Sequence, residues 1–512
     1  MQTSRVLKKI FNTDLRNIAL LRCSLAILVL VDLIHRSFYL SAHYSDYGLL
    51  PRVNAIELTA ALWQPSFHLS SGTAWFQGLL FALHGTAAFF MLIGYRSRLA
   101  CFITWLFTLS LHNRNRLITG GADELLIVLL FWAMFLPLGA KFAIDQIKRK
   151  KQNKVYTNNF FSVATAGLMI QVMCVYFFTA LLKTGAAWLP DGTAVYYALH
   201  IDRLVSPAGI WFRQFPDMMQ VLSYFVILFE FIAPVLMFSP WATQKIRAVL
   251  LPLFISMHLG FLVFMHIGFF PVVSIISLMI FIPTNFWDSI TSLSKKHLNT
   301  DSSGNSGDTT EIAGGDQPSV TNLNNGIACL CITLILTNNV LSLREIKIEP
   351  HPLVFHVSQL IRLQQGWIMF SPQPPKEDYW VIIKGQRVDG KVVDVLNNTL
   401  GEPDWSKPQH VADTFSNFRW RYLSQYLWKK RLSRFRQPYA RYLCRNWNMN
   451  EPDTELQLKK LEIFYMLEIT QPDYQPSPIK PVKVWTHDCL ALSADEIGEK
   501  INNNETNQQV EY

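Results

Sequence analysis

Charged residues are scarce in this sequence of 512 residues. They make up 16% of the chain, hydrophobic residues make up 50%, and the mean hydropathy is positive. A soluble two-domain protein needs more polar surface than this composition provides. The composition therefore excludes an ordinary soluble protein and favours a chain that crosses a membrane several times.

Metal-ligand spacings are also missing. The sequence contains no paired CxxC motifs and no HExxH motif, so no zinc or other metal site is predicted. Of the seven cysteines, five lie in or beside apolar runs and are expected to be small core residues. Cys444 and Cys489 lie in the C-terminal region, where an oxidising compartment would allow a disulfide.

An internal repeat, which a transporter would be expected to show, is not recognisable in the sequence. The net charge of +9 does not indicate nucleic-acid binding, because much of the basic excess lies in short flanks where membrane topology requires it.

Long apolar runs are what the chain has in abundance, and several approach the roughly 20 apolar residues that cross a bilayer. They are residues 17–40, 74–95, 97–111, 123–140, 159–183, 219–239, 246–265, 267–283 and 325–342. The third and eighth are marginal in length. We therefore predict a mainly α-helical, multi-pass transmembrane bundle of about nine spans.

Basic residues in the short flanks indicate the orientation of the bundle. A cytoplasmic N-terminus places the basic cluster at 141–154 and most other flanking Lys and Arg residues inside, and fewer outside. An odd number of spans then places the chain after about residue 343 on the outer face. The first apolar run has no small-residue cleavage site, so we expect a retained anchor.

Four regions follow from this reading of the chain. Residues 1–296 form the main bundle, 297–324 a flexible cytoplasmic linker rich in Ser, Gly, Asn and Asp, 325–342 the last span, and 343–512 a smaller extracytoplasmic α/β domain.

Local patterns predict the contents of this last region. Two β-rich runs around Asp389 and Gly390 predict a hairpin, and LEIFYMLEIT predicts another strand. A basic, aromatic stretch at 419–447 predicts one or two helices, broken at Pro438.

Lys183 ends a long apolar run and is followed five residues later by Trp188. One interpretation is a lysine that extends to water beside an interfacial tryptophan. The other is a buried amine that loses its charge easily and then serves as a general base near pH 7. Taken alone, Lys183 fits the first interpretation better.

Other polar groups are predicted in the same outer half of the bundle. They are His35, Arg36, the segments HYSDYGLLPR (43–52) and HNRNRLITGGADELL (112–126), Glu230, His258 and His266. Singly, each fits a structural role: His258 as a hydrogen-bonded core imidazole, and Glu230 as the partner of an arginine such as Arg36 or Arg114. Their joint placement at one membrane level favours a functional site.

Several motifs resemble one family over nearly the whole chain. They are HYSDYGLLPR, NRNRLITGGADELL, FLPLG, LLKTGAAWLPDGTAVYY, QQGWIMFSP, RWRYLSQ and YARYLCRNWN. These motifs are similar to those of the bacterial horizontally transferred transmembrane (HTTM) family, which is related to vitamin K-dependent gamma-glutamyl carboxylase. The spacing of Lys183 and Trp188 and the segment MHLGFLVFMHIGFFP resemble the carboxylase itself.

This resemblance implies a membrane enzyme of the bacterial inner membrane whose lysine deprotonates reduced vitamin K or another quinol. Lys183 would be the base and His258 would line the site, while the outer domain would hold a secreted peptide or protein substrate. The supporting residues would be Asp123, Glu230, Trp188, Asn115 and Arg114.

Two departures from the carboxylase pattern bear on this expectation. Asp123 stands where the carboxylase has a histidine, and an aspartate that approached Lys183 would keep the lysine charged and remove its basicity. The stretch from Leu259 to Phe261 lacks the asparagine of the carboxylase segment, and Gly260 and Phe261 stand in its place. We therefore expect a carboxylase-like lyase or maturation factor acting on a peptide or quinol at the outer leaflet, in contact with membrane lipid. The alternative is a non-catalytic membrane protein that binds peptides or serves as a scaffold, and the oligomeric state stays open.

Overall fold

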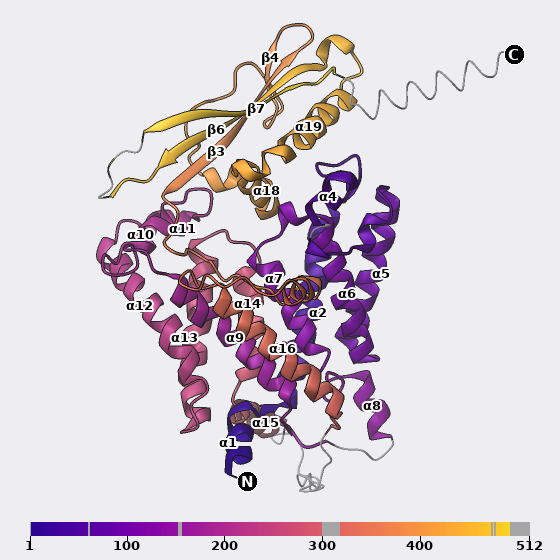
Figure 1. Cartoon of the computed structure of the whole chain (residues 1–512), viewed down its shortest axis with the longest axis vertical. Coiled ribbons are helices and arrows are strands. Elements are labelled where there is room, and N and C mark those ends of the chain that lie inside the picture. Colours follow the sequence, from indigo (N-terminus) through magenta and orange to yellow (C-terminus); the bar gives the residue numbers. More distant parts are fainter. Residues whose placement is uncertain are drawn as a thin grey trace, which may run out of the picture.

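The computed structural model describes residues 2–59, 62–151, 156–298, 318–472, 475 and 478–491. Most of the predicted linker, residues 299–317, lies outside the described residues. The chain forms a helical bundle that carries a five-stranded sheet at one end (Figure 1). We call this end of the bundle the sheet end; the N-terminus lies at the opposite end.

Helices account for most of the described chain. They are α1 (Gln2–Phe11), α2 (Leu15–Ser37), α3 (Leu40–Tyr44), α4 (Arg52–Thr59), α5 (Ala74–Ile93), α6 (Ser97–Arg114), α7 (Gly121–Ala133), α8 (Ile144–Lys150), α9 (Val163–Leu182), α10 (Ala194–Leu199), α11 (Pro207–Phe212), α12 (Pro216–Leu236), α13 (Thr243–Phe264), α14 (Phe270–Leu278), α15 (Thr284–Leu298), α16 (Asn322–Leu341) and α17 (Pro352–Leu360). Side chains that accept backbone N–H groups start several of them, such as Asp14 before α2 and Ser162 before α9.

Six helices in the described chain are long and apolar enough to cross a membrane: α2, α5, α9, α12, α13 and α16. A seventh span results if α14 and its 3-10 extension are combined with α15, although this pair bends by 86°. Each predicted apolar segment contains a helix, but α6 carries Arg98, His112 and Arg114, and α7 has only 13 residues. The structure thus shows fewer clear spans than the sequence predicts.

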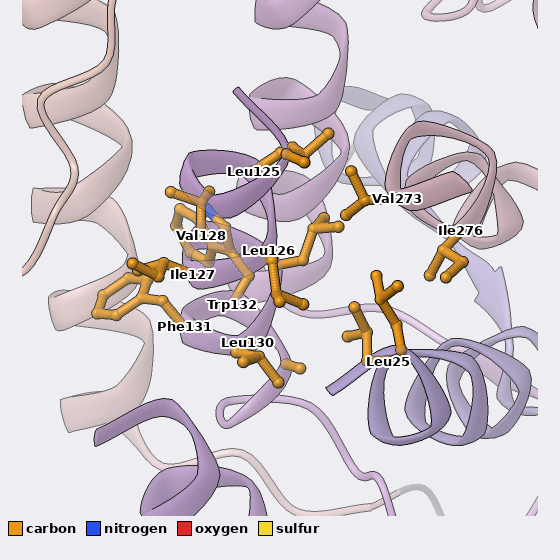
Figure 2. Close-up of a cluster of buried hydrophobic side chains, with 14 of the residues drawn as sticks. Leu25, Leu125, Leu126, Ile127, Val128, Leu130, Phe131, Trp132, Val273 and Ile276 are labelled. Carbon is orange, nitrogen blue, oxygen red and sulfur yellow. The ribbon is translucent and has the colours of Figure 1, made fainter. Parts of the chain in front are cut away.

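Helix α7 is an internal helix. Every residue from Leu125 to Ala133 is buried. Figure 2 shows Leu126 directed toward Leu25 of α2 and Val273 of α14, while Phe131 points to the other side. A helix that is apolar all round packs inside a bundle, and sequence alone does not separate it from a lipid-facing span.

The C-terminal sheet is antiparallel, with the strand order β5-β4-β3-β6-β7. Its strands are β3 (Glu377–Arg387), β4 (Val392–Asp394), β5 (Thr399–Leu400), β6 (Leu458–Ile469) and β7 (Ile479–Asp488). The predicted hairpin is confirmed between β3 and β4, where Gly390 takes a positive φ of 85° in the turn. The strand predicted from LEIFYMLEIT is β6. A second, two-stranded sheet pairs β1 (Thr13–Asp14) with β2 (Asn159–Phe160).

Two helices connect the sheet to the bundle: α18 (Phe418–Trp428) and α19 (Arg436–Asn450). The predicted break at Pro438 is wrong, because the helices separate at a 3-10 segment over Lys430–Phe435 and Pro438 lies in the first turn of α19. Proline is tolerated there because the first N–H groups of a helix have no intrahelical acceptor. A disulfide joins Cys444 on α19 to Cys489 after β7.

Candidate functional site

A cavity of about 820 Å³ lies at the sheet end of the bundle. Residues of α9, α12, α13 and α14 form its walls, and residues of α18 and of the segment 368–375 close it toward the sheet. Most of the lining is apolar. Four residues that the sequence singled out also line it: Lys183, Trp188, Glu230 and His258.

Lys183 is the residue that ends α9. Its Nζ donates a hydrogen bond to the carboxylate of Glu230 on α12 and lies 4.2 Å from the ring centroid of Trp188. Lys183 is 6% exposed and Glu230 is 5% exposed. The lysine therefore does not extend to water, and the interfacial interpretation of its position is wrong.

His258 on α13 lies on another wall of the same cavity. Its Nε2 is 2.8 Å from the hydroxyl of Tyr176, which stands two helical turns before Lys183 and so on the same face of α9. The Nδ1 atom of His258 is buried and has no hydrogen-bond partner among the described residues. Tyr176 also lines the cavity, and the sequence did not single it out.

The segment between α17 and β3 forms the rim of the cavity. It runs across the bundle before it rises to the sheet (Figure 1). The carbonyl of Phe370 accepts from Trp188 Nε1 at 3.0 Å, and the carbonyl of Pro372 accepts from the backbone N–H of Gly185 at 2.9 Å. The sequence placed this segment, with its QQGWIMFSP motif, in the outer domain. Its aromatic and apolar character outside any predicted span was the signal that it packs on the bundle.

The cavity also reaches the outer surface of the bundle between α12 and α13. The rings of Phe229 of α12 and Phe254 of α13 lie 4.6 Å apart. Leu222 and Phe225 of α12 and Leu253 of α13 line the cavity and are exposed. The mouth of the cavity is thus apolar and opens on the apolar surface of two candidate spans.

Asp123 belongs to a different cluster. Its carboxylate forms salt bridges with Arg36 of α2 and Arg419 of α18, and it accepts from the backbone N–H of Gly120 at 2.8 Å. The carboxylate beside Lys183 is therefore that of Glu230, and the arginine partner considered for Glu230 is replaced by a lysine.

Arg114 and Asn115 hold a loop in place and do not line the cavity. The Nη1 of Arg114 donates to the carbonyl of Leu50 at 2.9 Å, and Asn115 Nδ2 donates to the carbonyl of His43 at 2.9 Å. Both residues are fully buried. They position the segment 43–52 under the sheet, so the structure gives them a supporting role outside the cavity.

Asp32, His112 and Asp123 bring their possible ligand atoms within 4.8 Å of one another, a spacing that could hold a metal ion. Arg36 and Arg419, however, form salt bridges with both carboxylates. Two guanidinium groups already balance the two carboxylates, and an added cation would be repelled by the arginines. We assign this cluster a structural role.

The comparisons with known proteins agree with the family resemblance. The family model described as the HTTM domain matches residues 12–287, a range that contains Lys183, Glu230 and His258. No curated protein and no solved structure matches the chain. The matched range covers more than half of the sequence. The chain therefore belongs to the HTTM domain family, and its apolar helices identify it as a membrane protein.

Proposed function

We propose that this protein is a carboxylase-like membrane enzyme that removes a proton from the hydroxyl group of a lipid-soluble quinol. The observation that carries the proposal is the buried Lys183–Glu230 pair inside a large apolar cavity. A cavity of about 820 Å³ is within the range that encloses small organic ligands. Its apolar mouth between α12 and α13 fits a ligand that arrives from the membrane.

The Lys183–Glu230 pair supplies the acid–base chemistry. In a site with little water, an ammonium and a carboxylate lose the hydration that stabilises their charges, so transfer of one proton within the pair gives a neutral amine and a carboxylic acid at small cost. The neutral amine can then accept the hydroxyl proton. The ring of Trp188 favours the cation that results.

The other residues of the cavity position the ligand. A reduced quinone such as reduced vitamin K would supply the hydroxyl group, with its ring among the aromatic side chains. The His258–Tyr176 hydrogen bond fixes the imidazole so that its unpartnered Nδ1 stays available for a polar ligand atom. We place the sheet end on the outer face of the bacterial inner membrane, where a secreted peptide could reach the rim.

The competing function is that of a non-catalytic peptide-binding or scaffold protein. One observation favours it: the Lys183–Glu230 pair is complete, as a purely structural ion pair would be. The two functions differ in whether the lysine must release a proton.

Lys183→Arg separates the two functions. Arginine can keep the ion pair with Glu230 but does not give up its proton. We expect the purified protein with reduced vitamin K to incorporate labelled carbon dioxide into a glutamate peptide, and Lys183→Arg to lower this rate about a hundredfold or more with an unchanged melting temperature. Arg434→Gln, at an exposed pair with Glu57, is the control.

Two results would contradict the proposal. Incorporation that survives Lys183→Arg would exclude the lysine as the base, and no incorporation with any quinol tested would exclude carboxylation. If Lys183→Arg does not fold, the double variant Lys183→Met/Glu230→Gln removes both charges together and leaves no unpaired buried ion. Peptide binding without incorporation would identify the scaffold function.

A further inference from the structure

A second cavity, of about 440 Å³, lies at the opposite end of the bundle from the sheet. The start of α6, the turn after α7, helix α8 and residues 318–319 line it. Figure 1 shows α8 far from the sheet, at the end where the N-terminus lies. The cavity is therefore separate from the site proposed above.

Three arginines line this second cavity: Arg96, Arg98 and Arg149. Asp145 is the one carboxylate among the lining residues that the structure describes, and its hydrogen bonds are made within the fold. It accepts from the backbone N–H groups of Arg96 at 2.9 Å and Ser97 at 2.8 Å, and from the Ser97 hydroxyl at 2.7 Å. The described lining residues thus carry an excess of positive charge.

Part of this arginine set is held in place by the protein and part is not. The Nη2 of Arg149 donates to the carbonyl of Gly139 at 2.7 Å, and its guanidinium stacks 4.5 Å from the ring of Tyr156. Arg98 uses only its Nε, toward the carbonyl of Leu136 at 3.2 Å. Within the described chain, the terminal nitrogens of Arg98 and the guanidinium of Arg96 have no acceptor within hydrogen-bonding distance.

We propose that this cavity binds a phosphate group, and that the group belongs to the headgroup of an anionic phospholipid. The planar guanidinium fork matches the oxygens of a phosphate, and charge-assisted hydrogen bonds of this kind are strong. The general preference for basic residues on the cytoplasmic side explains why arginines occur here. It does not explain why three of them surround one cavity.

The surroundings favour a lipid as the source of the phosphate. Leu99 lines the cavity and is 49% exposed, and Phe102, one turn further along α6, is 43% exposed. An acyl chain can lie along this apolar face while its headgroup occupies the cavity. A free phosphate ion would make no use of these side chains.

The test measures binding of phosphatidic acid and of inorganic phosphate to the full-length protein in nanodiscs of phosphatidylcholine. We expect saturable binding of phosphatidic acid, weakened about tenfold by Arg96→Gln/Arg98→Gln. The matched control is Lys150→Gln/Lys245→Gln, which removes two exposed charges outside the cavity and should change the affinity less than threefold. A size-exclusion profile and a melting curve establish that each variant is folded.

The outcomes separate the sources of phosphate. Binding of phosphatidic acid without a response to inorganic phosphate supports the lipid headgroup. A saturable response to inorganic phosphate that is lost in Arg96→Gln/Arg98→Gln supports a phosphate site but overturns the lipid assignment. Equal losses in the arginine variant and the lysine control show general surface attraction and overturn the site, as does the absence of saturable binding in both experiments.

Discussion

Arg419 ties helix α18 to the bundle. It is buried, forms salt bridges with Asp32 and Asp123, and donates to the carbonyl of Ile118 at 3.0 Å. Arg419→Gln would leave the two carboxylates to share Arg36. Removing one partner from a buried ion network costs about 3–5 kcal/mol. We expect a loss of this size in the free energy of unfolding, measured by denaturant titration in detergent.

A matched variant tests whether the loss of stability expected for Arg419→Gln arises because its ion pairs are buried. Arg434→Gln removes an arginine from a pair with Glu57 in which both side chains are about half exposed, and such pairs contribute less than about 1 kcal/mol. Asp32→Asn added to Arg419→Gln should restore part of the stability, because it removes one uncompensated carboxylate. Similar losses for Arg419→Gln and Arg434→Gln would show that the network contributes little.

For individual residues, the sequence predicted which side chains are unusual but not which partners they contact. Lys183, Trp188, Glu230 and His258 were identified, and the structure brings them to one cavity. Their neighbours depend on the packing of helices far apart in sequence, which a single chain does not reveal. For this reason the carboxylate beside Lys183 proved to be Glu230, while Asp123 pairs with arginines.

Helices α7 and α9 approach each other closely at Gly167. A Cβ built on Gly167 would lie 2.3 Å from the ring of Trp132, which is fully buried. Gly167→Ala should therefore separate the helices and cost about 1–3 kcal/mol, as overpacking does. Gly78→Ala on α5 meets no atom within 4 Å and is the control. Thermal unfolding in detergent measures both, and equal midpoints would contradict the close packing.

The rim of the cavity depends on another glycine. A Cβ built on Gly185 would lie 2.8 Å from the side chain of Gln373 and 3.0 Å from the carbonyl of Pro372. We expect Gly185→Ala to displace the rim and to speed amide hydrogen exchange over residues 367–373. Gly366→Ala, with nothing within 4 Å, should leave exchange unchanged. Unchanged exchange in Gly185→Ala would show that the rim is held elsewhere.

The burial of individual helices explains where the predicted spans differ from the observed ones. Hydropathy identifies apolar runs, but α7 is apolar because protein surrounds it, as Figure 2 shows. Helix α13 is the opposite case, since only 22% of its apolar window is buried. Helices α7 and α13 are both apolar in sequence, and only their packing in the structure distinguishes them.

For the whole molecule, the sequence predicted the change from a bundle to an α/β region but only part of the sheet. Strands β3, β4 and β6 follow from their β-rich patterns. Strand β7 was missed because it lies at the edge of the sheet, where exposed lysines and Pro481 weaken the pattern. The close attachment of the sheet to the bundle, through Arg203 to Asp378 and Lys407 to Asp202, was not predictable because it joins distant segments.

This attachment should make the stability of the molecule depend on pH through His200, which lies after α10 at the junction. Burial lowers the pKa of His200 from its ordinary value of 6.5 to about 4; Arg213 and Lys407 lower it further, while the Tyr196 carbonyl and Asp202 raise it. The folded chain therefore takes up this proton only near pH 4, whereas the unfolded chain takes it up near pH 6.5. The stability that depends on a neutral His200 is fully present above pH 6.5. It is lost as the pH falls toward 4.

His200→Gln removes this titration. We expect the melting temperature of the natural protein to fall between pH 7 and pH 5, and that of His200→Gln to fall less over the same interval. Asp202 does not produce the same effect, because Arg213 and Lys407 outweigh its burial and lower its pKa from 3.8, below this interval. An identical pH dependence in both proteins would show that folding does not lower the pKa of His200.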